Sequence, residues 1–160
     1  MTRQLTLLVV GLLFWTVSSG QTLSPKVLTE IQQTSEFAAI TSLLEEKGFK
    51  KSTEQSSNAF ETIEKWYFQP FVYSGEAVSS SLTKTVDSSL KAKTVFSLYN
   101  PFHYKEFIKN LTDAKYKFRG TKYVNGNIYY VFRKKGYTFT TTEKTANDKT
   151  KSYQIILQTD

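Results

Sequence analysis

The chain contains no cysteine and a single histidine, His103. The lack of cysteine excludes disulfide bonds, thiol chemistry and a lipid-anchored lipoprotein. A zinc site would have to be built from carboxylates around one imidazole, and no loop of alternating acids closed by Gly and Glu offers a calcium site. The sequence therefore predicts neither a metal centre nor another cofactor.

Hydrolytic catalysis has little support in the sequence. A Ser-His-Asp triad would need His103 as its base, but this residue lies in the first turn of a predicted helix, where the helix dipole disfavours protonated imidazole. No Gly-x-Ser-x-Gly elbow is present. The pairs Glu45-Glu46 and Glu61 with Glu64 are the carboxylates that a glycosidase would need, although neighbouring acids are more often solvated surface. The sequence favours a protein that is not an enzyme, with a small carboxylate-dependent hydrolase as an alternative.

Only one long apolar run is present, from Leu5 to Trp15, and it follows the positive Arg3. It falls short of the roughly 20 residues that span a bilayer, and Ser18 and Gly20 suit the −3 and −1 positions of a cut before Gln21. Residues 1–20 are therefore predicted to be a cleavable signal peptide, and the mature protein to be secreted or periplasmic without a membrane span. A cysteine-free exported domain of this size favours a bacterial origin.

Charge is unevenly distributed along the mature chain. Residues 21–100 carry eight lysines and nine acids, whereas residues 101–160 carry twelve Lys and Arg and five acids. Such asymmetry indicates an anionic partner. In an exported protein, this partner is expected to be an acidic polysaccharide, a lipid headgroup or an acidic protein, and not nucleic acid.

Turn and cap residues divide the mature chain into helices and strands. Ser24-Pro25 and Asn100-Pro101 each predict a helix start, and another helix is expected to run from Ser35 to Gly48, which suits the left-handed residue after a helix. Asn125-Gly126 predicts a tight hairpin. Strands are expected over 49–55, 59–68, 93–99, 116–123, 127–133, 137–143 and 152–158, with weaker strands over 69–74 and around 78–86. Residues 59–68 would also fit a helix, because Phe60, Ile63, Trp66 and Tyr67 share one helical face.

The two halves of the mature chain are similar in pattern. At a fixed spacing of 67, the matches are Phe37 with Tyr104, Ile40 with Phe107, Leu44 with Leu111, Phe49 with Tyr116 and Lys50 with Lys117. We therefore expect an α+β protein, a tandem repeat of two helix-plus-antiparallel-sheet units over 21–99 and 100–160, either separate or fused into one domain.

A signal peptide followed by two such units resembles the architecture of the β-lactamase-inhibitory protein family and of exported bacterial proteins of similar size. The resemblance covers the mature chain at the level of element order. No diagnostic motif matches and the disulfides of the inhibitor cannot form, so no functional residue is carried over. An inhibitor of a secreted or periplasmic enzyme remains an alternative function.

Alternation along the second-half strands predicts two different sheet faces. One face is expected to bury the helix Pro101 to Ala114, and it carries Tyr116, Phe118, Ile128, Tyr130, Phe132, Tyr137, Phe139, Tyr153, Ile155 and Leu157. The opposite face carries basic and aromatic side chains, of which Lys115, Lys117, Arg119, Tyr129 and Arg133 are the candidate ligand-binding residues. The leading hypothesis is an exported, non-catalytic binding module that uses this second face.

Overall fold

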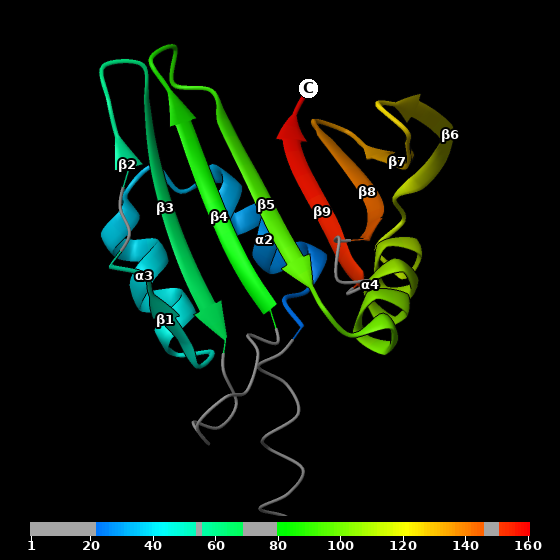
Figure 1. Cartoon of the computed structure of the whole chain (residues 1–160), viewed down its shortest axis with the longest axis horizontal. Coiled ribbons are helices and arrows are strands. Elements are labelled where there is room, and N and C mark those ends of the chain that lie inside the picture. The colour runs from blue at the N-terminus through cyan, green and yellow to red at the C-terminus, as the bar shows by residue number, and fades with distance from the viewer. Residues whose placement is uncertain (1–21, 54–55, 69–79, 146–150) are drawn as a thin grey trace, which may run out of the picture.

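The computed structural model describes residues 22–53, 56–68, 80–145 and 151–160, and the predicted signal peptide and the predicted strand at 69–74 lie outside them. The elements, labelled as in Figure 1, are α2 (Pro25–Gln33), α3 (Phe37–Glu45), β1 (Phe49–Lys51), β2 (Ser56–Ser57), β3 (Glu61–Phe68), β4 (Ser80–Asp87), β5 (Ala92–Leu98), α4 (Pro101–Asp113), β6 (Lys117–Val124), β7 (Asn127–Lys134), β8 (Tyr137–Thr145) and β9 (Lys151–Thr159).

The nine strands of the described residues form one antiparallel sheet in the order β1-β3-β4-β5-β9-β8-β7-β6, and the short β2 pairs with β3. Strand β5 of the first half lies beside β9 of the second, with Phe96 opposite Ile155. The fold is therefore α+β, as predicted. One continuous sheet joins the residues on both sides of the predicted boundary between 99 and 100.

All three helices pack on the same face of the sheet; Figure 1 shows α2 behind β4 and β5, and α4 beside one end of β8 and β9. The Phe37 ring of α3 stacks on Trp66 of β3, with 6.5 Å between the ring centroids. Phe107 of α4 contacts Phe139 of β8, with 5.9 Å between the ring centroids. The core side chains of this face include Trp66, Leu82, Phe96, Ile155, Leu157 and Phe139. No helix within the described ranges is long and apolar enough to cross a membrane.

The helix starts predicted at Ser24 and Asn100 are confirmed. The helix predicted from Ser35 to Gly48 is shorter, because α3 begins at Phe37 after Glu36, with no side-chain cap hydrogen bond, and ends at Glu45. The Ser24 hydroxyl accepts a hydrogen bond from the Val27 amide at 3.3 Å, and the Asn100 side chain accepts one from Phe102 at 2.8 Å, so both predicted N-caps form. The turn between β6 and β7 has φ of 50° at Asn125 and 78° at Gly126, as a two-residue hairpin requires.

The predicted order recurs in both halves, because α3 precedes β1, β3, β4 and β5, and α4 precedes β6, β7, β8 and β9. The residues matched at a spacing of 67 also share their burial: Phe37 and Tyr104 are half-buried, Ile40, Phe107, Leu44, Leu111, Phe49 and Tyr116 are buried, and Lys50 and Lys117 are exposed. These equivalences support the tandem-repeat hypothesis, which stays a prediction.

Candidate functional site

The sheet face opposite the helices, here called the open face, carries two of the predicted site residues side by side. Lys117 of β6 lies directly opposite Arg133 of β7, and Arg133 lies opposite Thr138 of β8. Both cations are exposed, and neither forms an ion pair with another described residue. Like charges at directly opposed positions destabilise a sheet, so this pair costs folding free energy unless an anion neutralises it.

The other three predicted residues are placed differently. Tyr129 lies on the open face opposite Lys122, a cation that sequence alternation had missed. Arg119 lies in a β-bulge, because Phe118 pairs with Phe132 and Gly120 with Val131, which leaves Arg119 without a partner in the register. This extra residue shifts the alternation by one and thereby brings Lys122 to the open face.

Lys115 does not belong to the sheet face, and this part of the prediction is wrong. It follows α4 with a φ of 66°, its amide bonds to the Thr112 carbonyl at 2.9 Å, and the Tyr116 amide bonds to the Leu111 carbonyl at 3.0 Å. These are the two hydrogen bonds of a Schellman motif, with lysine in the position that usually holds glycine. Lys115 is exposed beside the hairpin and adds charge to it.

The hairpin β6–β7 is strongly basic. Between Asp113 and Glu143 the sequence contains seven Lys and Arg and no acid. Strand β6 is also an edge strand, and all its residues are exposed except Gly120, which is half-buried. An edge strand with several cations resists pairing with a copy of itself and attracts anions.

The helix side of the same hairpin is less covered than the sequence predicted. Phe118, Ile128 and Tyr130 were expected under the helix 101–114 but are 55 %, 50 % and 41 % exposed. Helix α4 packs over β8 and β9 instead, through Phe107 on Phe139 and Tyr104 stacked on Tyr153 at 4.5 Å. The hairpin therefore has a basic face and an exposed apolar face.

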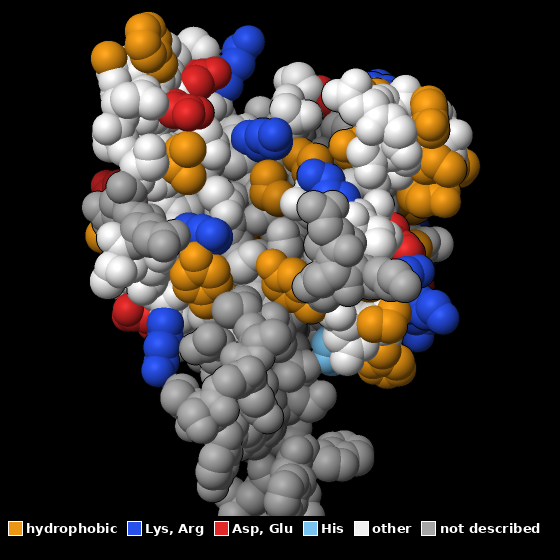
Figure 2. Space-filling model, viewed as in Figure 1, with side chains coloured by type: hydrophobic (Ala, Val, Ile, Leu, Met, Phe, Trp, Pro, Cys, Tyr) orange, Lys and Arg blue, Asp and Glu red, His pale blue; other side chains and the backbone are white. Residues whose placement is uncertain are grey.

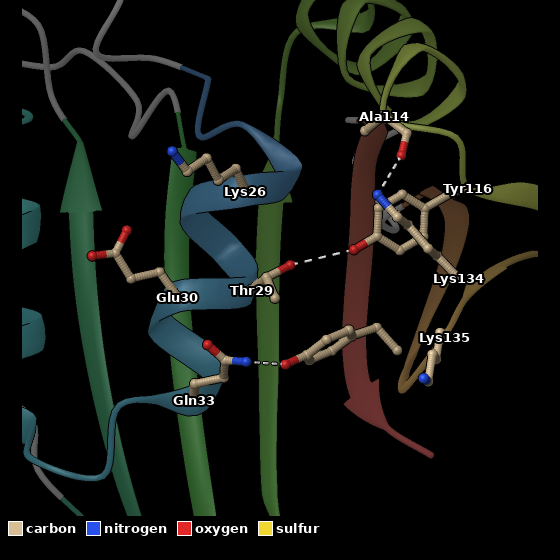
Figure 3. Close-up of a pocket in the computed structure, with 9 residues that line it drawn as sticks. Lys26, Thr29, Glu30, Gln33, Ala114, Tyr116, Lys134 and Lys135 are labelled. Carbon is tan, nitrogen blue, oxygen red and sulfur yellow. Dashed lines mark hydrogen bonds between the residues drawn. The ribbon is translucent and has the colours of Figure 1, made fainter.

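A groove of about 590 Å³ lies between α2 and the strands β7 and β8 (Figure 3). Its polar side chains already contact one another across it. The Thr29 hydroxyl of α2 lies 3.4 Å from the Tyr116 hydroxyl, and the Gln33 amide donates to the Tyr137 hydroxyl. On the strand side, the Lys134 ammonium donates to the Ala114 carbonyl at 2.8 Å. The groove thus lies between α2 and the second half of the chain, and three lysines and one acid line it: Lys26, Lys134, Lys135 and Glu30.

Lys84 is a buried lysine that the sequence analysis missed. Its side chain is 1 % exposed, and its ammonium donates to the carbonyls of Ile31 at 2.6 Å, Gln32 at 3.4 Å and Thr34, at the C-terminal end of α2. Burial lowers the pKa of Lys84 from 10.5 to about 8. The contacts give Lys84 a structural role, capping α2 against β4, since cations are stabilised at helix C-termini.

The candidate catalytic groups do not converge. Glu61 and Glu64 are three residues apart on β3, so they lie on opposite faces of the sheet, and Glu64 pairs with Lys51 at 2.8 Å. His103 Nδ1 lies 3.8 Å from Oε2 of Glu106, one turn further along the same helix. Over the described residues, no group of three or more His, Asp or Glu side chains could hold a metal ion.

In comparisons with known proteins, no family model, no curated protein and no solved structure matches the chain.

Proposed function

We propose that this protein is an exported, non-catalytic binding module that holds an anionic partner on its β6–β7 hairpin. The observation that carries the proposal is the opposed pair Lys117 and Arg133, which has no ion-pair partner among the described residues and lies within a stretch of seven cations and no acid. An anionic group placed between the two cations removes their repulsion and gains attraction from both. Lys122 and Tyr129 extend the same surface toward the tip of the hairpin.

The first test is the binding of a soluble polyanion, dextran sulfate, to the exported protein and to the triple variant Lys117→Gln/Arg119→Gln/Arg133→Gln. Exposed charge pairs contribute modestly each, so we expect the triple variant to bind about tenfold more weakly at low salt. The difference should shrink at about 0.15 M salt, where charges are screened within about 8 Å. Calorimetry at two salt concentrations measures both effects.

The matched control is Lys47→Gln/Lys50→Gln/Lys91→Gln, which removes the same charge from the first half of the chain. This variant should keep most of the affinity. Equal weakening of both triple variants would show that binding follows net charge, and the hairpin would then have no special role. Circular dichroism confirms that each variant is folded.

A further inference from the structure

Apolar side chains are exposed on both faces of the β6–β7 hairpin, next to its polar turn Asn125-Gly126. The exposed fractions of its apolar side chains are 75 % for Tyr123, 48 % for Val124 and 50 % for Ile128. Tyr123 and Val124 are consecutive in β6, so their side chains point to opposite faces, and Ile128 lies opposite Tyr123. Figure 2 shows hydrophobic side chains gathered at the β6 edge of the molecule. Exposed apolar side chains on both sides of the hairpin end indicate a partner that contacts both sides at once.

Two hollows with apolar walls flank Phe132, between α4 and the hairpin. One, of about 410 Å³, is lined by Tyr104, Ile108 and Tyr130, with Lys105 and Glu143 beside them. The other, of about 400 Å³, is lined by Phe118, with Lys115 and Lys117 beside it. In the first hollow, the charges of Lys105 and Glu143 balance. The second hollow combines an apolar wall with two lysines and no acid, which matches an acyl chain below an anionic headgroup.

Charge decides between the possible occupants of this surface. A second copy of the chain would bring Lys117, Arg119 and Lys122 of its own β6 against the same residues, and like charges would repel. A polysaccharide would neutralise the cations but would leave Val124 and Ile128 in water. A bilayer with acidic lipids can contact both the cations and the apolar side chains, because its headgroups attract Lys and Arg and its interface accepts aromatic and aliphatic side chains.

We infer that the anionic partner is a lipid bilayer surface bearing acidic headgroups, with the tip and the apolar face of the β6–β7 hairpin in its interfacial layer. This inference rests on the proposed function and adds the class of partner to it. Lys122 lies two residues from Val124, about 7 Å along the strand, so its ammonium lies at headgroup depth when the tip enters the interface.

The test uses vesicles of phosphatidylcholine alone and of phosphatidylcholine with phosphatidylglycerol, and the protein purified in its exported form. Co-sedimentation should show binding to the acidic vesicles and little to the neutral ones. The variant Phe118→Ser/Ile128→Ser should bind acidic vesicles at least about tenfold more weakly and keep its affinity for dextran sulfate, because only apolar contact is lost. The control Phe60→Ser, which removes a side chain 76 % exposed just before β3, should bind like the wild type.

A second measurement does not depend on the apolar variant being well folded. Because the chain has no cysteine, Val124→Cys provides a unique thiol for a polarity-sensitive fluorophore. Its emission should shift to the blue when acidic vesicles are added, whereas the same label on Phe60→Cys should not shift. A label at position 124 that stays in water while the vesicles bind would overturn the inference.

The outcomes separate the inference from the proposed function. Binding to dextran sulfate or polyglutamate without binding to acidic vesicles would overturn the lipid inference alone, and would identify a polysaccharide or an acidic protein as the partner. Unchanged vesicle binding by Phe118→Ser/Ile128→Ser would do the same. Failure to bind dextran sulfate, polyglutamate and acidic vesicles alike would overturn the proposed function itself.

Discussion

Replacing Lys84 by methionine is expected to lower the free energy of unfolding by about 2–4 kcal/mol. Methionine fills most of the volume of the side chain, but it cannot donate hydrogen bonds to the carbonyls of Ile31, Gln32 and Thr34. Buried acceptors without a donor cost free energy, and the end of α2 would lose its connection to β4. Urea denaturation measures the change.

The control for this variant is Lys93→Met, which makes the same substitution at an exposed position of β5 and should change stability by no more than about 0.5 kcal/mol. A loss of similar size in both variants would contradict the capping role of Lys84.

The same lysine gives a pH dependence of defined sign. Its pKa is about 8 in the folded protein and 10.5 in the absence of burial, so between these values the unfolded chain binds more protons than the folded one. The free energy of unfolding of the wild type should therefore rise with pH across this window, relative to Lys84→Met. A relative decrease would show that the helix carbonyls raise the pKa of Lys84 more than burial lowers it.

The second large effect is expected at Gly48, where α3 turns into β1. Gly48 has a φ of 82°, and a Cβ added there would lie 3.0 Å from Cε2 of Phe68, whose ring packs on Phe49 in the core. Gly48→Ala places alanine in the left-handed region, which costs about 1–2 kcal/mol, and also forces the Phe68 ring to move. The free energy of unfolding is therefore expected to fall by about 2–3 kcal/mol.

Gly126→Ala is the matched comparison for this prediction. Gly126 has nearly the same φ, 78°, but no atom lies within 4 Å of an added Cβ. The free energy of unfolding of Gly126→Ala should fall only by the cost of the left-handed backbone, about 1–2 kcal/mol. Equal losses in the two variants would mean that Phe68 moves aside at no cost.

Signals that act between neighbouring residues could be predicted from the sequence. The caps at Ser24 and Asn100 and the Asn125-Gly126 turn formed as expected, because each depends on side chains and dihedral angles within a few residues. The alternation of β7, β8 and β9 also placed Arg133 and Tyr129 on the open face correctly.

Features that depend on distant contacts could not be predicted in this way. The bulge at Arg119 adds one residue to β6, and alternation cannot detect it without the register of the partner strand. The position of α4 over β8 and β9 leaves Phe118 and Ile128 exposed, although their pattern is that of a buried face. The burial of Lys84 follows from the packing of α2 on the sheet, which no local pattern encodes.

We propose above that the β6–β7 hairpin is the surface that binds an anionic partner. This binding is tested most directly by following the backbone amides of the protein without residues 1–20 by NMR while a short dextran sulfate is added. The largest changes in amide chemical shift are expected within residues 115–135, with Lys117, Lys122 and Arg133 among them, and the shifts of β3 and β4 should change little. Largest changes in β3 and β4, or shifts spread evenly over the described residues, would contradict it.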